Sequence, residues 1–310
     1  MKILISGSSG LVGAAVSDAL RRDGHTVCRL LRPQSPSGDE SAKASAATTD
    51  IHWDPISGEL NATRAEHADA VVHLAGASIA AGRWTEERKG VLRSSRADAT
   101  RHLVGALARL REPPAVFVSA SAVGYYGNRG EEELTESSAP GNDFLAALSR
   151  DWETEATRAE TFGARVAILR FGVILSARGG ALPRMLVPFR LGLGGKLGSG
   201  KQWMPWLALG EAVSAIRFAL GEPGARGAIN AVTASPVRNR DFTATLGRIL
   251  RRPTIFPVPE FALRLALGEM ADALLLASQR VLPRKLPLLG YRFEQPELEP
   301  ALAAILRPEG

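Results

Sequence analysis

The sequence predicts an α/β protein with a doubly wound parallel sheet and a smaller, mainly helical C-terminal region. Three observations indicate this fold. The chain opens with a short apolar strand that leads into a glycine turn and a helix. Apolar strands and amphipathic helices then alternate as far as residue 175, which is typical of a parallel sheet with right-handed crossovers. From residue 176, glycine and proline become frequent and the later segments are mainly helical.

The composition fits one large domain or two closely joined ones. With 310 residues, of which 45% are hydrophobic and 23% charged, the chain can bury a sizeable core. We expect a sheet domain over residues 1–175, to which residues 207–235 return. The remaining segments, 176–206 and 236–310, are expected to form a substrate-binding cap.

Charge and cysteine content narrow the class of protein. The net charge of +6 comes mainly from arginine, which suits the recognition of phosphate and carboxylate groups. Because the chain has no dense basic run and no zinc-ligand cluster, an anionic cofactor is favoured over nucleic acid. The single cysteine, Cys28, and an N-terminus without a signal-peptide pattern predict a cytoplasmic protein. The most apolar window, residues 261–282, contains four charged side chains, so no membrane span is expected.

The first strand, with Ile3 to Ile5, ends in the glycine turn. Gly7 makes the tight turn, Gly10 lets the backbone approach a pyrophosphate, and Gly13 lets helix and strand pack closely. The N-terminus of the following helix faces the anion. A strand before the glycines and a helix after them supply the context that this motif needs. The stretch therefore predicts a Rossmann-type dinucleotide site.

The second strand, residues 25–32, ends where the adenosine ribose of a dinucleotide would lie. NAD-binding proteins place an acidic residue there, whereas this chain offers Arg29 and Arg32. Arginine favours the 2′-phosphate of NADP, although a solvated arginine at a strand end stays an alternative for each. Residues 33–50, rich in small and polar side chains, are predicted to form a loop that flanks the adenine end.

The next strands end in small and polar residues. The strand at 70–76 ends in Ala75-Gly76, and its His73 is expected to be a packed core residue rather than a catalyst. A long helix is predicted over 85–111. The strand at 114–121 then ends in a polar and aromatic cluster, and ligands bind outside the carboxyl ends of such strands. The cluster comprises Ser119, Ser121, Tyr125 and Tyr126.

The second half of the chain supplies the rest of the sheet and the cap. A helix over 144–161 and one buried strand over 165–175 are predicted, and that strand contains Arg170. The glycine-rich loop at 194–206 is expected to line a substrate pocket rather than to contain a core strand. Residues 211–220 and 228–232 should return to the sheet, and 241–250 and 259–282 should form a helical cap. The basic residues Arg170, Arg190, Lys196 and Lys201 either meet an anionic substrate or are solvated.

Several motifs resemble the extended short-chain dehydrogenase/reductase superfamily, in its NAD-dependent epimerase/dehydratase branch. They are the glycine turn, Val72-His-Leu-Ala-Gly76 and Phe117-Val-Ser-Ala-Ser-Ala-Val-Gly-Tyr-Tyr-Gly127. Further segments are similar to an atypical subgroup, the epimerase-family proteins, which have a C-terminal domain of unknown function here matched by residues 247–298. These are Arg83-Trp-Thr-Glu-Glu-Arg88, Asp151-Trp-Glu153, Phe189-Arg-Leu-Gly-Leu-Gly-Gly195 and Gly198-Ser-Gly-Lys-Gln-Trp203.

The resemblance implies roles for particular residues. Ser121 matches the catalytic serine of the superfamily, and Arg32 would contact the adenosine phosphate. The pyrophosphate would be lined by Gly7, Ser9, Gly10, Leu11 and Gly13, and the nicotinamide side by Ala75, Gly76, Ser119 and Ala120.

The sequence departs from the superfamily at the acid/base pair. Superfamily catalysis uses a Tyr-x-x-x-Lys pair, in which lysine lowers the tyrosine pKa so that it can exchange a proton near neutral pH. No tyrosine or lysine occurs between Gly127 and Lys196. Tyr125 or Tyr126 is the nearest phenol, and each is either a proton donor or a packed residue. The leading hypothesis is an NADP(H)-dependent oxidoreductase for a small polar or anionic molecule, ahead of a non-catalytic NADP(H) sensor and a nucleotide-sugar epimerase.

Overall fold

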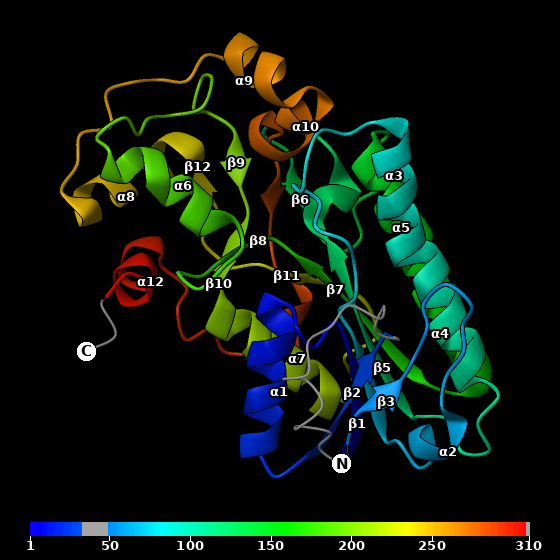
Figure 1. Ribbon diagram of the computed structural model, residues 1–310. Coiled ribbons are helices and arrows are strands. Elements are labelled where there is room, and N and C mark those ends of the chain that lie inside the picture. Colours follow the sequence, from blue (N-terminus) through cyan, green and yellow to red (C-terminus); the bar gives the residue numbers. More distant parts are fainter. Residues whose placement is uncertain (33–48, 308–310) are drawn as a thin grey trace, which may run out of the picture.

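A computed structural model describes residues 1–32 and 49–307, and its centre is a parallel sheet between two helical layers (Figure 1). This arrangement confirms the predicted fold class. The predicted loop at 33–50 lies outside the described residues except for its last two positions. The seven strands, in spatial order, are β11 (Gly227–Ala231), β7 (Arg165–Phe171), β5 (Val116–Ala122), β4 (Ala70–His73), β1 (Lys2–Ser6), β2 (Thr26–Leu31) and β3 (Ile51–His52).

The strand order places a topological switch point between β1 and β4. The chain moves outward from β1 to β2 and β3, then returns to the other side of β1 through β4 and β5. In open α/β sheets, the crevice at the carboxyl ends of the strands beside such a point is where ligands bind. The glycine turn after β1 and the Ala75-Gly76 segment after β4 lie side by side at this switch point.

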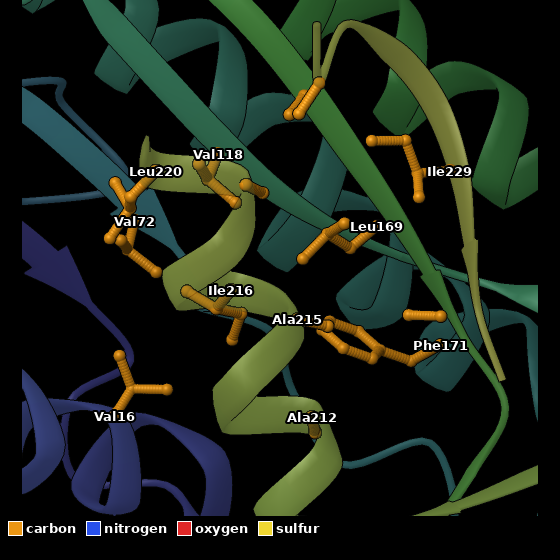
Figure 2. Close-up of a cluster of buried hydrophobic side chains, with 14 of the residues drawn as sticks. Val16, Val72, Val118, Leu169, Phe171, Ala212, Ala215, Ile216, Leu220 and Ile229 are labelled. Carbon is orange, nitrogen blue, oxygen red and sulfur yellow. The ribbon is translucent and has the colours of Figure 1, made fainter. Parts of the chain in front are cut away.

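One face of the sheet is covered by α1 (Leu11–Arg22) and α7 (Leu209–Gly221). Figure 2 shows side chains of both helices, Val16 and Ile216 among them, packed against Val72, Val118 and Leu169 of the strands. All five of these side chains are fully buried. Strands buried on both faces need nearly continuous apolar sequence, which explains the apolar runs by which the strands were predicted.

The opposite face is covered by α4 (Ala99–Leu107) and α5 (Phe144–Thr157), with the short α2 (Ala62–Ala65) at its edge. The helix α3 (Glu86–Arg93) packs on α5 through Leu92. The helix predicted over 85–111 begins as expected, because the Thr85 side chain caps it by accepting from the Arg88 amide. It is not one α-helix, however. A π-helical segment, Ser94–Asp98, separates α3 from α4, and α4 ends at Leu107.

The predicted strand over 165–175 is in fact two strands in different sheets. The strand β7 ends at Phe171, just before Gly172. A Cβ atom on Gly172 would lie 2.7 Å from the Pro205 carbonyl oxygen. The chain then continues as β8 (Val173–Leu175), which pairs with β10 (Trp206–Ala208) away from the main sheet. The expectation that no core strand occurs in 194–206 is therefore wrong at its end, because Trp206 begins β10 and is fully buried.

The cap is built around a separate apolar cluster beyond the carboxyl edge of the sheet. Its helices are α6 (Ala181–Arg190), α8 (Asn239–Leu250) and α12 (Leu298–Ile305), which pack around Trp206 and Phe242. The smaller elements are β6 (Glu133–Leu134), β9 (Trp203–Met204), β12 (Val237–Arg238), β13 (Arg280–Val281), α9 (Glu260–Leu267), α10 (Glu269–Ala271) and α11 (Lys285–Leu288). The helical segment predicted over 259–282 is too long, since its last helical turn ends at Leu276 and β13 then pairs with β6.

Glu211, in the first turn of α7, connects the sheet to the C-terminal segment. Its carboxylate is 3% exposed and accepts hydrogen bonds from the Tyr291 hydroxyl and from the amides of Glu294 and Gln295. Burial, followed by the hydrogen bond to Glu211, raises the Tyr291 pKa. Glu211 is thus a structural carboxylate rather than a group that faces a ligand.

Candidate cofactor and catalytic site

The glycine turn has the geometry expected of a phosphate-binding loop. Gly7 has φ +70°, and a Cβ atom on it would lie 2.7 Å from the Leu74 backbone. At Gly13 a Cβ would lie 2.1 Å from the Gly7 carbonyl oxygen, so only glycine allows β1 and α1 to pack this closely. At Gly10, by contrast, a Cβ would meet the Gly7 oxygen at 3.3 Å and, chain neighbours aside, no other atom of residues 1–32 and 49–307 within 4 Å.

The α1 N-terminus is suited to an anion. No side chain among the described residues caps it, so its first amides are available to a ligand. Ser9 and Gly10 are exposed at the turn, and Leu11 is half-buried beside Gly180, where a Cβ would lie 3.3 Å from the leucine Cδ2. An open glycine at an uncapped helix N-terminus is the cradle that a pyrophosphate needs.

The two arginines of the second strand have different surroundings. Arg29 forms a bidentate ion pair with Asp50, with N–O distances of 2.7 and 2.5 Å. Hydrogen bonding to Asp50 raises the Arg29 pKa. Arg32 lies just beyond β2 and is exposed. Of the pair, Arg32 is therefore the one that is exposed and forms no ion pair among the described residues.

Arg96 lies against the Ala75-Gly76 segment and is a residue that sequence reasoning missed. A Cβ atom on Gly76 would lie 3.3 Å from its guanidinium carbon. The guanidinium donates to the Ala77 carbonyl oxygen at 3.0 Å and lies 5.3 Å from the ring centre of Trp152. Burial, with a smaller effect of nearby Arg88, lowers the Arg96 pKa to about 10. Within the described part of the chain its hydrogen-bond partners are the backbone carbonyl oxygens of Leu92 and Ala77, and no carboxylate pairs with it.

Ser121 and Tyr126 belong to one buried hydrogen-bond network at the carboxyl ends of β5 and β7. The Ser121 hydroxyl donates to Glu153 Oε1 at 2.6 Å, and Arg170 donates to both Glu153 oxygens at 2.8 and 2.7 Å. The Tyr126 hydroxyl accepts from Arg170 at 2.9 Å and donates to Asn230 Oδ1 at 2.6 Å. Burial raises the Tyr126 pKa to about 12, against the opposing effect of Arg170.

Tyr125 is placed differently from Tyr126. Its side chain is half-buried, and the Arg170 guanidinium carbon lies 3.4 Å from the centre of its ring. No hydrogen bond among the described residues engages its hydroxyl, which is therefore free for a ligand. Ser119 is fully buried and donates only to the adjacent Ala120 carbonyl oxygen, at 3.1 Å.

The basic residues that could meet an anionic substrate differ in their burial and contacts. Arg170 is 3% exposed and is fully engaged by Glu153 and Tyr126, so it is not a substrate contact. Arg190, Lys196 and Lys201 are exposed. The roles of Glu153 and Asn230 as partners of Ser121 and Tyr126 could not be predicted from the sequence, although Asp151-Trp-Glu153 is one of the segments that resemble the family.

His73 is the packed core residue that the sequence predicted. It is fully buried, with Ser6 Oγ 2.6 Å from Nδ1 and Thr100 Oγ1 2.8 Å from Nε2. Burial lowers its pKa to about 4. Because the unfolded chain takes up a proton near pH 6.5 and the folded chain only near pH 4, stability should fall as the pH drops through this window.

We expect His73 to contribute about 2.5 kcal/mol to the loss of unfolding free energy between pH 7.5 and pH 4.5. Denaturant unfolding at the two pH values measures this loss. His73→Gln, which cannot be protonated, should show a smaller loss by about that amount. An equal loss in both proteins would show that His73 is protonated within the fold.

Comparison with known proteins places these features in a family. Residues 3–231 match the model of the NAD dependent epimerase/dehydratase family. The chain belongs to this family. Residues 258–305 match a domain of unknown function, DUF1731, which begins and ends somewhat later than the 247–298 expected.

Relatives in this family cover the whole chain. An epimerase family protein of Mycobacterium bovis, Mb2239, is 42% identical over 307 residues, covering 99% of this chain and 98% of that protein. YfhF of Bacillus subtilis, also an epimerase family protein, is 37% identical over 307 residues, with 99% and 98% covered. The crystal structure of human epimerase family protein SDR39U1 with NADPH is 33% identical, with a TM-score of 0.87, and covers 98% of this chain and 99% of that one.

Proposed function

We propose that this epimerase-family chain is an NADP(H)-dependent oxidoreductase that acts on a small polar or anionic molecule. The observation that carries the proposal is the open Gly10 at the uncapped N-terminus of α1, on the same sheet edge as Ser121 and Tyr125. The human relative, solved with NADPH, supports the choice of cofactor. When bound, the nicotinamide would donate or accept a hydride.

The residues around the crevice fit this cofactor. In this proposal Arg32 meets the 2′-phosphate, and Arg96 supplies a positive charge beside Gly76. The pyrophosphate would lie along Gly7, Ser9, Gly10, Leu11 and Gly13, and the nicotinamide side along Ala75, Gly76, Ser119 and Ala120. The sheet domain would thus hold the cofactor and the cap the substrate, in a protein that works in the cytoplasm. Within the described ranges, no helix has the length and apolar content needed to cross a bilayer.

Arg32→Glu is expected to remove a preference for NADPH over NADH. One charge-assisted hydrogen bond to the 2′-phosphate contributes about 1.5–3 kcal/mol, so the native preference should be about tenfold or more. Titration calorimetry with both cofactors measures it. Arg109→Glu makes the same charge change at another exposed position and should leave the preference intact. Equal affinities of the native protein for the two cofactors would contradict the assignment.

A non-catalytic NADP(H)-binding sensor is the second candidate, and one observation favours it. The hydroxyls of Ser121 and Tyr126 both donate to buried protein groups, so neither proton is free for a substrate. A broad panel of carbonyl compounds, assayed for NADPH oxidation, separates the two functions. No oxidation with any compound, together with NADPH-dependent association with a protein partner, would favour the sensor.

A further inference from the structure

The chain has no Tyr-x-x-x-Lys pair, but the Tyr125 phenol and the Arg170 guanidinium are in contact beside Ser121. Tyr125 lies in the 3₁₀ turn Val123–Tyr126 that follows β5, and Arg170 lies on β7 directly beside Ser121 in the sheet register. The guanidinium carbon is 3.4 Å from the Tyr125 ring centre and 5.2 Å from that of Tyr126. The two aromatic rings are perpendicular, at an angle of 82°.

Hydrogen bonds to neighbouring side chains hold the Arg170 guanidinium in place. Its Nε and Nη2 donate to the two oxygens of Glu153, and its Nη1 donates to the Tyr126 hydroxyl. Its planar face is left for the Tyr125 ring. Because Glu153 Oε1 also accepts from Ser121, this single carboxylate sets the position of Ser121 relative to the guanidinium, and so relative to Tyr125.

The two phenols differ in what they can do with a proton. Tyr126 is fully buried and gives its proton to Asn230, and its raised pKa opposes ionisation. Tyr125 is half-buried, and nothing in the described part of the chain holds its hydroxyl. A substrate oxygen at the sheet edge can therefore reach the phenol of Tyr125 without breaking an existing hydrogen bond.

We propose that Arg170, held by Glu153, positions Tyr125 and stabilises its phenolate, so that Tyr125 exchanges the proton with the substrate oxygen. This inference rests on the oxidoreductase proposed above. In the reducing direction, the substrate carbonyl carbon accepts the hydride while the electron pair of the C=O bond moves to oxygen. That oxygen takes the proton from Tyr125 Oη, and solvent protonates the resulting phenolate. Arg170 and Glu153 are positioning residues, and Tyr125 is the catalytic one.

The first test uses the protein without cofactor, by following tyrosinate absorbance against pH. The chain has three tyrosines, Tyr125, Tyr126 and Tyr291, and burial raises the pKa of the latter two. Around Tyr125 the charged and titratable groups are Arg170 of β7, Glu153 of α5, the adjacent Tyr126 and Glu136, whose carbonyl oxygen lies 3.5 Å from Arg170 Nη1.

The phenol that ionises at the lowest pH should disappear in Tyr125→Phe and persist in Tyr126→Phe. Arg170→Gln should move that step to higher pH, and Arg170→Lys, which keeps a cation, should move it less. A first ionisation that survives Tyr125→Phe, or that Arg170→Gln leaves unmoved, would overturn the inference. Glu153→Gln, which keeps a hydrogen-bonding group beside Arg170, provides a second variant if Arg170→Gln does not fold.

The second test follows the reaction. With a carbonyl compound that the native protein reduces, Tyr125→Phe should lower kcat by about 10²- to 10⁴-fold and leave the NADPH dissociation constant unchanged. Tyr126→Phe, which removes one hydrogen-bond partner of Arg170 but leaves its pair with Glu153, should lower kcat less than Tyr125→Phe. Arg170→Gln should lower kcat rather than raise KM, and Arg170→Lys should restore part of the loss. If the native protein is active and Tyr125→Phe is equally active, the inference is overturned. A native protein that is inactive on every compound would instead contradict the proposed oxidoreductase. The phenol titration would then decide the role of Arg170.

Discussion

A Gly10→Val variant is expected to fold normally and to bind NADPH about 100-fold more weakly, or worse. The backbone at Gly10 has φ −75° and ψ 168°, which is extended and open to any residue. Among the described residues, a Cβ there would approach only the Gly7 oxygen, at 3.3 Å, so we expect the free protein to accept the side chain. The branched methyl groups would occupy the space in front of the α1 amides, where the pyrophosphate needs direct contact.

Gly13→Val is the matched comparison for this prediction. The same side chain at Gly13 would place its Cβ 2.1 Å from the Gly7 oxygen, so β1 and α1 would have to separate. We therefore expect Gly13→Val to lose thermal stability as well as NADPH binding. Circular dichroism and thermal unfolding report the fold, and NADPH fluorescence reports binding. Native affinity in a folded Gly10→Val protein would mean that the turn holds no phosphate.

The first half of the fold could be predicted because its strands are buried on both faces. Apolar runs such as Ile3 to Ile5 have no solvent-facing alternation, and the glycines that follow them mark the turn. The break at Gly172 could not be predicted in this way. Val173 to Leu175 is as apolar as the strand before it, and only the close approach of Pro205 shows why the chain changes sheets there.

The glycine turn could be predicted from the sequence, whereas the buried cluster around Ser121 could not. A glycine turn is local, so its residues and its helix are adjacent in the sequence. The Ser121, Glu153 and Arg170 cluster comes from β5, α5 and β7, and it depends on the register that sets Ser121 beside Arg170. Such a pairing has no sequence spacing of its own. From the sequence alone, Arg170 could therefore be interpreted as a substrate contact. The structure shows instead that it pairs with Glu153.

Ser121→Ala is expected to lower the rate of carbonyl reduction by about 10²- to 10³-fold without changing NADPH affinity, because in the proposed reaction the Ser121 hydroxyl turns from Glu153 and donates to the substrate carbonyl oxygen. The substitution removes the hydroxyl nearest to Glu153 but leaves that carboxylate paired with Arg170, so the fold should survive.

The prediction for Ser121 has a matched comparison on the same strand, since Ser119 is also buried and its hydroxyl donates only to the Ala120 carbonyl oxygen. Ser119→Ala, at a residue that would line the nicotinamide but has no bond to Glu153, should therefore lower the rate less than Ser121→Ala. We also expect no useful epimerisation of nucleotide sugars, because the chain has no Tyr-x-x-x-Lys pair. Stopped-flow absorbance of NADPH and product analysis measure the two activities. Efficient epimerisation that survives the combined loss of Ser121, Tyr125 and Tyr126 would require an acid/base group elsewhere, and would refute both the oxidoreductase and the role given to this cluster.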